Sequence, residues 1–373
     1  MRFLFVCGGS AGHINPAIAI ADQVRDKQPE SEILFVGAGK ILEKRLIPEA
    51  GYNLINIKMS GLRRGISPGD IIHNIKTARN LFTANIKAAK LLKTFKPDAV
   101  IGTGGYICYP VLKKAAKRKI PTFILEPNAY PGLTVRMLSS YVDKIFVTYP
   151  GLENRFNRPE CVVYTGTPLK KEFFDNIAPA SQIPNEKAVK ALVISYWGSH
   201  GAIGMNNNIL GFIKKNIEEN SFNHIHATGV SSSPEEMLTR LEKMGVTQSK
   251  APIADIREYI DDMPSVMKTA DLVISRAGAS TIAELTALGK PAILVPSPNV
   301  TENHQEENAK QLQKNGGAKM ILEKDCTGEM LYKTVMDLLD DKEALNKMIK
   351  AQKSLSIPNA SEKIVDIVTG YCK

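Results

Sequence analysis

The sequence predicts an α/β protein made of two doubly wound parallel sheets, and three observations support this prediction. At 373 residues the chain exceeds one ordinary hydrophobic core and fits two domains. Continuous apolar runs alternate with helical stretches, as expected for parallel strands that are covered on both faces. A glycine-rich turn follows several of these runs in each half. Ligands of such sheets bind beyond the carboxyl ends of the strands, so the turns are the expected functional sites.

Nine apolar runs are expected to form strands, with crossover helices between them. The runs are RFLFVCGG (2–9), SEILFVGA (31–38), AVIGTG (99–104), TFILEP (122–127), KIFVTY (144–149), ALVISYWG (191–198), FNHIHATG (222–229), DLVISRAG (271–278) and PAILVPSP (291–298). Between the first five and the last four, residues 178–188 are polar and proline-bearing and lack periodicity. We place the connection at or just before this stretch, which gives domains of 1–165 and 166–354.

The chain has five cysteines, an odd number without C-x-x-C spacing, so neither a disulfide framework nor a zinc site is expected. It contains no run of eighteen apolar residues, and the first strand begins directly after Met1 without a basic leader and cleavage site. We therefore expect a protein of the reducing cytosol that is neither secreted nor membrane-spanning.

The basic charge is concentrated in the first half. Residues 1–165 contain 24 Lys and Arg against 12 Asp and Glu, whereas the remainder contains 24 against 26. Between Lys58 and Lys119 there are 14 basic residues and only two acidic ones, Asp70 and Asp98. Such a cluster suits nucleic acid, an anionic membrane surface or a diphosphate substrate, and a merely solvated surface is the alternative. No nucleic-acid partner is expected, because no recognisable RNA or DNA motif accompanies the cluster.

Residues 71–95 are expected to form one or two amphipathic helices. The apolar positions at near-helical spacing are Ile71, Ile75, Phe82, Ile86 and Leu92, and the interleaved basic ones are Lys76, Arg79, Lys87, Lys90 and Lys93. Packing of the apolar face on the sheet is the default expectation. Any exposed part would suit a peripheral membrane site, with Phe82, Lys87, Lys90 and Lys93 as its candidates.

The first glycine-rich turn, residues 7–13 (CGGSAGH), lies between a strand and a helix and tolerates phosphate. Its G-G-x-x-G spacing is not the dinucleotide fingerprint, so hydride transfer is not indicated. Pro16 is expected near the helix start, where a missing N–H costs little. His13 is the candidate general base because imidazole titrates near neutrality, and a structural histidine is the alternative.

The second turn, residues 102–106 (GTGGY), again follows a strand and lies within the basic region. Together with the first turn it is expected to form a diphosphate-binding floor of N–H groups and helix dipoles. The residues of this floor are Gly12, Gly104, Gly105 and Tyr106. Close backbone packing is the alternative reason for the glycines. Glu126 and Asn128 lie at the end of the fourth run (122–127) and are expected to point at the same cleft.

Residues 271–308 form the most informative stretch, because a strand runs into a small-residue turn (277–279), a helix, another strand and a polar loop. This order places a nucleotide at a strand's carboxyl end. Glu284, within one helical turn, can accept two hydrogen bonds from a ribose diol. A T-x-x-E capping box of Thr281 and Glu284 is the alternative and needs no ligand. The turn GSHGA (198–202) repeats the plan, with the Ser199 hydroxyl and a helix N-terminus available to a diphosphate.

Six blocks of the chain resemble, in order, those of the peptidoglycan N-acetylglucosaminyltransferases, the MurG family. They are residues 8–21, 102–110, 126–134, 165–173, 198–202 and 271–308. The resemblance implies a GT-B fold, in which two Rossmann-like domains face a central cleft and the last helix, here 355–373, crosses back to the first domain. It also implies inverting transfer of GlcNAc from UDP-GlcNAc to lipid I, the undecaprenyl-linked muramoyl-pentapeptide, which forms lipid II at the cytoplasmic face of the cell membrane.

The resemblance further implies residue roles. The first domain would use His13, Glu126 and Asn128 in catalysis and the glycine floor for the acceptor diphosphate. The positions expected around the donor are Lys170, Ser199, Ile260, Ala279, Ser280, Thr281, Glu284, His304 and Gln305. Among these, the Ile260 backbone would contact uracil, Glu284 the ribose, and Lys170 the leaving UDP. No Asp-x-Asp motif is present and Asp261-Asp262 is interpreted as a helix start, so no metal or other cofactor is expected.

Two places depart from the family pattern. Leu125 and Pro127 replace two polar residues around Glu126, which puts local acceptor contacts in doubt. Trp197 stands where glycine is usual and is expected to narrow or re-aim its turn. The alternatives to a lipid I transferase are a UDP-GlcNAc 2-epimerase or a glycolipid glycosyltransferase of the same fold. A donor-binding paralogue that serves as a non-catalytic partner in wall assembly is the alternative outside enzymes.

Overall fold

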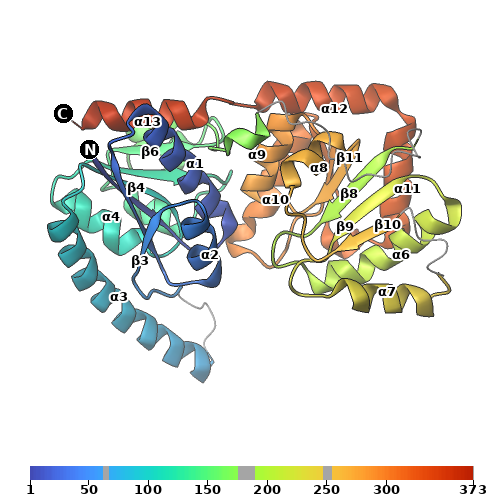
Figure 1. Ribbon diagram of the computed structural model, residues 1–373, viewed down its shortest axis with the longest axis horizontal. Coiled ribbons are helices and arrows are strands. Elements are labelled where there is room, and N and C mark those ends of the chain that lie inside the picture. Colours follow the sequence, from blue (N-terminus) through green and yellow to red (C-terminus); the bar gives the residue numbers. More distant parts are fainter. Residues whose placement is uncertain (62–66, 175–189, 247–253, 373) are drawn as a thin grey trace. The chain divides into compact units, whose positions relative to one another are not determined.

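The computed structural model describes residues 1–61, 67–174, 190–246 and 254–372 (Figure 1). The chain divides into two compact units, of which the first comprises Met1–Lys170 with Ile357–Lys373 and the second Lys171–Ser356. The stretch 178–188, where we expected the connection, lies outside the described residues. Each unit is an α/β sandwich around one parallel sheet, so the predicted fold class is confirmed.

The first unit contains a seven-stranded sheet in the order β3-β2-β1-β4-β5-β6-β7, and every neighbouring pair is parallel. Its strands are β1 (Arg2–Cys7), β2 (Glu32–Gly37), β3 (Asn53–Asn56), β4 (Ala99–Gly104), β5 (Thr122–Glu126), β6 (Lys144–Val147) and β7 (Val162–Tyr164). The strand order reverses between β1 and β4, which places their carboxyl ends at the topological switch point where such folds bind ligands.

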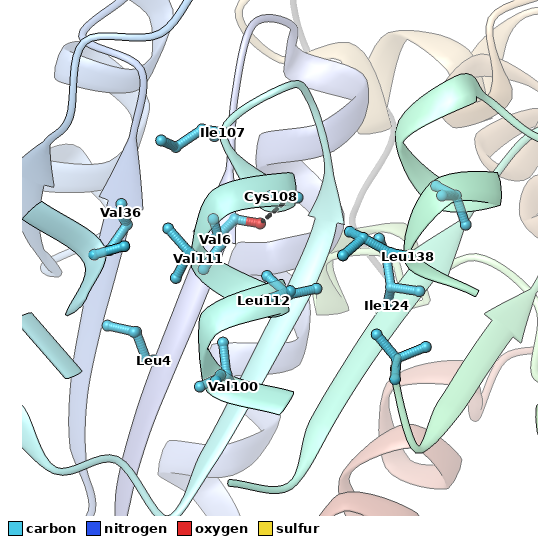
Figure 2. Close-up of a cluster of buried hydrophobic side chains, with 14 of the residues drawn as sticks. Leu4, Val6, Val36, Val100, Ile107, Cys108, Val111, Leu112, Ile124 and Leu138 are labelled. Atoms are coloured by element: carbon cyan, nitrogen blue, oxygen red, sulfur yellow. Dashed lines mark hydrogen bonds between the residues drawn. The ribbon is translucent and has the colours of Figure 1, made fainter. Parts of the chain in front are cut away.

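Both faces of this sheet are buried, because β1, β4 and β5 are mostly apolar and all their residues except Arg2 are buried. On one face Leu4, Val6 and Val100 pack under α4 (Cys108–Lys117), whose Val111 and Leu112 cover them (Figure 2). The Cys108 thiol donates to the carbonyl oxygen of Val6 at 3.2 Å. These contacts fix the start of α4 directly behind the second glycine-rich turn.

The other face is covered by α1 (Ala11–Lys27) and α13 (Ala360–Tyr371), which contact each other (Figure 1). Ile364, Val365 and Val368 of α13 are fully buried in the same apolar cluster as the central strands. Lys27 of α1 forms an ion pair with Asp366 of α13 at 2.6 Å. The end of the chain is therefore an integral part of the first unit's core.

Helix α1 begins earlier than predicted. Its first residue is Ala11 and its N-cap is Ser10, so Pro16 lies inside the helix and not near its start. At this position proline removes the N–H that would otherwise bond to the Gly12 carbonyl. The remaining helices of this unit are α2 (Ile41–Glu49), α3 (Pro68–Phe95) and α5 (Leu133–Leu138).

Helix α3 turns its large apolar residues outward, which corrects the expectation that they pack on the sheet. Ile71, Ile75, Phe82 and Ile86, here called the α3 stripe, are all exposed, Phe82 at 69%. Of the predicted apolar face only Leu92 is buried. The side that packs inward also carries Thr77, Ala84 and Ala88. Each of these lies two positions after an exposed residue of the stripe, and two positions along a helix turn the side-chain direction by about 200°. Small residues thus let α3 approach α4 closely while the bulky ones remain outside.

The second unit contains a six-stranded parallel sheet in the order β10-β9-β8-β11-β12-β13. Its strands are β8 (Leu192–Tyr196), β9 (Asn223–Ala227), β10 (Ala254–Arg257), β11 (Leu272–Ser275), β12 (Ala292–Leu294) and β13 (Ala318–Met320). Its helices are α6 (Ile203–Glu219), α7 (Pro234–Lys243), α8 (Met263–Thr269), α9 (Ala279–Leu288), α10 (His304–Lys314), α11 (Gly328–Asp340) and α12 (Lys342–Leu355).

A polar network is buried in the core of this unit. The Ser195 hydroxyl lies 2.8 Å from His224 Nε2 and 2.7 Å from His226 Nδ1, and all three residues are buried. Burial lowers the pKa of His226 to about 3, and burial with the neighbouring His226 lowers the pKa of His224 well below its usual value. Both imidazoles are therefore neutral at physiological pH.

Candidate functional site

The two glycine-rich turns of the first unit pack directly against each other. His13 Nδ1 lies 2.9 Å from the Gly8 carbonyl oxygen, and the Thr103 hydroxyl donates to the His13 carbonyl at 2.6 Å. Gly104, at φ +123°, packs directly on the imidazole of His13. A side chain does not fit at this position, because its Cβ would lie 2.3 Å from His13 Cδ2. A Cβ at Gly105 would lie 2.6 Å from the Gly8 carbonyl oxygen. The close-packing explanation for these glycines is thus confirmed, and anion binding by the same turns remains a prediction.

The Gly8 carbonyl determines how His13 can act. A carbonyl oxygen only accepts, so the close contact requires Nδ1 to carry the proton. In the neutral imidazole Nε2 then holds the lone pair. This tautomer makes Nε2 the proton-accepting atom of the ring, as a general base requires, and the catalytic role of His13 remains a prediction.

Glu43 of α2 supports the first turn, and the sequence analysis missed it. Its buried carboxylate accepts from the backbone N–H of Gly9 at 2.9 Å, of Gly39 at 2.7 Å and of Lys40 at 2.9 Å. One carboxylate thereby joins the turns after β1 and β2. Lys40 is the N-cap of α2 and Glu43 its third residue, but lysine cannot accept a hydrogen bond, so the sequence carries no capping-box signal and indicated neither the local bonds nor the bond to Gly9.

Glu126 ends β5 and organises the loop that follows it. Its Oε1 accepts from the Asn128 backbone and side-chain amides, both at 3.0 Å, and its Oε2 accepts from the Gly132 N–H at 2.7 Å. Burial raises the pKa of Glu126 to about 7, although these three bonds oppose the shift. Glu126 and Asn128 are therefore brought together as expected, in a contact that shapes the loop.

The two departures from the family pattern beside Glu126, Leu125 and Pro127, are both buried. Leu125 points into the apolar cluster under α1, so its side chain is on the core side of the strand. Pro127 is also buried.

Tyr106 is exposed, and its ring packs on Gly61, where a Cβ would lie 2.3 Å from Cε2.

In the second unit the turns after β8 and β9 interlock. Gly201, at φ +71°, has its Cα against the Thr228 carbonyl oxygen, because a Cβ there would lie 2.1 Å away. Trp197 lies directly before the turn of residues 198–202, and its expected effect, to narrow or re-aim that turn, remains a prediction. Its ring is buried, 3% exposed, in the core cluster and lies 5.9 Å from the Arg276 guanidinium. Ser199 remains in the turn ahead of α6, whose first N–H groups have no helical acceptor.

The start of helix α9 tests the capping-box interpretation of Thr281 and Glu284, while the ribose contact of Glu284 remains a prediction. The helix begins at Ala279 with Gly278 as its N-cap, and no side chain caps it. Thr281 is therefore the third residue of the helix and not its cap, so the capping-box alternative is wrong. Ala279 and Ser280 form the first turn, directly beyond the carboxyl end of β11.

The remaining donor candidates lie on other loops of the second unit, with one exception. His304 begins α10, and the Gln305 side-chain oxygen accepts from the Ser297 N–H at 2.9 Å, so Gln305 holds the loop after β12. Ile260 is buried in the loop before α8. Lys170 is the last residue of the first unit. Asp262 caps α8 through Ser265, which confirms the pair Asp261-Asp262 as a helix start.

Two absences apply to the described ranges. Within them, no group of three His, Cys, Asp or Glu side chains is arranged to hold a metal ion. No helix there is both long and apolar enough to cross a membrane.

Comparison with known proteins places this geometry among glycosyltransferases. Residues 3–147 match the glycosyltransferase family 28 N-terminal domain, and residues 193–364 match the family 28 C-terminal domain. A protein of Acetivibrio thermocellus is 40% identical over 377 residues, covering 100% of this chain and 99% of its own length. It is named UDP-N-acetylglucosamine–N-acetylmuramyl-(pentapeptide) pyrophosphoryl-undecaprenol N-acetylglucosamine transferase. A Lactococcus lactis protein of the same name is 37% identical, with 99% of both chains covered.

Solved structures share the fold at lower identity. The crystal structure of Acinetobacter baumannii MurG matches with a TM-score of 0.73 and 24% identity over 99% of both chains. A putative UDP-N-acetylglucosamine 2-epimerase of Listeria monocytogenes matches with a TM-score of 0.72 and 14% identity, covering 100% of this chain and 96% of its own. Fold alone therefore does not separate transferase from epimerase.

Proposed function

The chain belongs to glycosyltransferase family 28 and, within it, to the MurG family of N-acetylglucosaminyltransferases, and from this premise we propose that it transfers GlcNAc from UDP-GlcNAc to lipid I, forming lipid II. The observation that supports this most strongly is the 40% sequence identity, over the full length of the chain, to relatives named as this transferase. The epimerase, by contrast, is similar in fold at only 14% identity. The acceptor is assigned to the first unit and UDP-GlcNAc to the second.

His13 Nε2 serves as the base of this reaction. It accepts the proton of the acceptor hydroxyl while the hydroxyl oxygen forms a bond to the anomeric carbon. The bond between that carbon and the β-phosphate oxygen breaks, and UDP leaves with the electron pair, so the configuration inverts. Free N–H groups at the starts of α6 and α9 stabilise the charge that develops on the diphosphate.

The decisive experiment supplies labelled UDP-GlcNAc with a lipid I analogue and measures glycolipid product and free UDP. We expect equimolar product and UDP, both dependent on acceptor. A 2-epimerase would isomerise the sugar nucleotide without acceptor, and a non-catalytic paralogue would bind UDP without turnover. Either outcome would replace the proposal.

Replacement of Glu284, the carboxylate assigned to the ribose, gives a first prediction. Glu284→Ala should weaken UDP binding by about 1.5 to 3 kcal/mol, because a charge-assisted contact to the ribose diol is lost. Isothermal calorimetry measures this directly. Glu329→Ala, an exposed carboxylate in α11 of the same unit, is the matched control and should bind UDP normally. Unchanged affinity in Glu284→Ala with a lowered melting temperature would give Glu284 a purely structural role.

The α3 stripe and its basic neighbours are the proposed contact with an anionic membrane surface at the cytoplasmic face. Four large apolar side chains stand exposed on one side of the helix, and Lys87, Lys90 and Lys93 are exposed on the same helix. Apolar insertion and electrostatic attraction act together in such contacts, and neither alone gives stable binding.

The second prediction tests this contact. Changing Lys87, Lys90 and Lys93 together to Glu should reduce binding to anionic vesicles roughly ten- to a hundredfold, because each basic residue contributes up to about 1 kcal/mol that salt screens. Vesicle sedimentation at low and high salt measures it, and turnover of a soluble acceptor should persist. Lys342, Lys347 and Lys350 of α12, changed together to Glu, provide a control with the same change in net charge. Vesicle binding that is the same at low and high salt and is unchanged in both triple variants would refute a membrane role.

A further inference from the structure

The peptide group between Gly8 and Gly9 is hydrogen-bonded on both of its sides. Its carbonyl oxygen, that of Gly8, lies 2.9 Å from His13 Nδ1, and its N–H, that of Gly9, donates to Glu43 Oε1 at 2.9 Å. The carbonyl and the N–H of a trans peptide point in opposite directions, so Glu43 and His13 lie on opposite sides of one planar group. A buried carboxylate is thereby joined to the candidate base through a single peptide.

Capping of α2 explains only one of the two oxygens of Glu43. Its Oε2 accepts from the N–H groups of Gly39 and Lys40, which lie directly ahead of the helix. Its Oε1 reaches instead to a turn 34 positions away. Glycines leave room for this carboxylate, because a Cβ would lie 2.6 Å from Oε2 at Gly37 and 3.1 Å from Oε1 at Gly8. The bond to the first turn therefore needs an explanation of its own.

The orientation of the peptide determines which nitrogen of His13 carries the proton. With the Gly8 carbonyl toward the ring, Nδ1 has to donate, whereas a reversed peptide would present the Gly9 N–H and Nδ1 would have to accept. Sterics restrain this peptide little, since two glycines flank it and a Cβ on Gly9, at φ +93°, would meet no atom of the described residues within 4 Å. The Ser10 hydroxyl, 3.4 Å from Nδ1, can donate or accept and so selects neither form.

Glu43 supplies the restraint that the glycines lack. A carboxylate only accepts hydrogen bonds, so it holds the N–H of the peptide toward α2 and would repel the carbonyl of the reversed orientation. A bond from the N–H to an ionised group also polarises the peptide, which strengthens its carbonyl as an acceptor.

We propose that Glu43 is a positioning residue for His13, which holds the Gly8–Gly9 peptide so that the imidazole carries its proton on Nδ1 and keeps the Nε2 lone pair for the acceptor hydroxyl. This inference rests on the proposed function, in which His13 is the base.

Glu43→Gln tests the inference with a side chain of the same size. Its single acceptor oxygen can serve Gly39 and Lys40, but its NH₂ group then faces the Gly9 N–H and cannot accept from it. Long-range proton–nitrogen NMR spectra of protein labelled in its six histidines report the tautomer above about pH 8, where imidazole is neutral, and His13→Ala identifies the His13 signals. We expect the proton on Nδ1 in the wild type and a shift toward Nε2 in the variant.

Kinetics of the same variant measure the effect on the reaction. Turnover should fall roughly ten- to a hundredfold at saturating substrates, as is typical when a group that orients a functional histidine is lost. KM for UDP-GlcNAc should change less than about threefold, because the donor is assigned to the second unit. Asp341→Asn is the matched control, since it removes the capping carboxylate of α12 with the same change in net charge. It should keep both the His13 tautomer and kcat.

Glu43→Asp separates the cap from the positioning role and serves if the glutamine variant does not fold. The shorter carboxylate can still cap α2 but is drawn back from Gly9, so the tautomer and turnover should change while the melting temperature stays near that of the wild type. A wild type with the His13 proton on Nε2, or folded Glu43 variants that keep the proton on Nδ1 or keep wild-type turnover, would overturn the positioning role and leave the proposed function standing. The expected tautomer change in a protein that forms no glycolipid would overturn the proposed function alone.

Discussion

His13→Ala lowers turnover roughly 10²- to 10⁴-fold at saturating substrates, while the affinity for UDP hardly changes. The size of the effect follows from the loss of a positioned proton acceptor in the step that forms the glycosidic bond. UDP affinity is spared because His13 belongs to the first unit, whereas the residues assigned to the donor nucleotide, Lys170 excepted, lie in the second. Initial rates across a pH series, with UDP calorimetry alongside, measure both quantities.

The pH series also separates His13 from Glu126. Burial holds the pKa of Glu126 at about 7, so both groups can produce an acidic limb in the rate profile. If His13 is the base, the acidic limb disappears in His13→Ala and persists in Glu126→Gln. A His13→Ala variant that keeps most of its activity would remove His13 from the mechanism and leave Glu126 as the candidate.

Acidification from pH 7 to pH 4 lowers the free energy of unfolding of the second unit by about 3 kcal/mol through His226 alone. The unfolded chain binds a proton at this imidazole below its usual pKa of about 6.5, whereas the folded chain does so only near pH 3. The contribution is therefore fully present above pH 6.5 and is lost as the pH falls toward 3. His224 acts in the same direction, since burial lowers its pKa as well.

Urea unfolding at several pH values tests this, and Trp197 is a convenient probe. It is the sole tryptophan, is buried, and its ring lies 6.3 Å from that of His226, so its fluorescence follows the second unit. His226→Leu should flatten the pH dependence by about 3 kcal/mol between pH 7 and 4, whatever its effect on stability at pH 7. His200→Leu, at an exposed position, should leave the dependence intact. An unchanged slope in His226→Leu would assign acid lability to other groups.

All nine predicted strands are present, and the four that the sequence analysis missed share one property. They are β3, β7, β10 and β13, which form the two edges of each sheet. Their sequences NLIN, VVY, ADIR and AKM are short, and three of them carry polar residues. Edge strands are partly exposed and are often short, so they lack the continuous apolar run that marks a strand buried on both faces.

The candidate site was predictable where it lies in turns and not where it depends on contacts between distant segments. The turns around His13 and Gly104 follow strands and carry a glycine signature, which local reasoning detects. The bond from Gly9 to Glu43 spans 34 positions, and the contact of Gly201 with the Thr228 carbonyl joins turns that follow two different strands. The predicted packing of α3 on the sheet was also wrong. Hydrophobic periodicity identifies the apolar side of a helix but does not say whether that side faces protein or solvent.

The packing of α13 into the first unit has a consequence for synthesis of the chain. Translation proceeds from the amino terminus, so β1 and α1 leave the ribosome early, yet the apolar side chains of α13 that complete their core are made only after the whole second unit. The second unit, by contrast, is contiguous in sequence and is complete before α13 emerges. We therefore expect the second unit to fold first, with the first unit awaiting the emergence of α13. A nascent chain stalled before residue 360 would accordingly expose the half that carries His13 to chaperones and proteases.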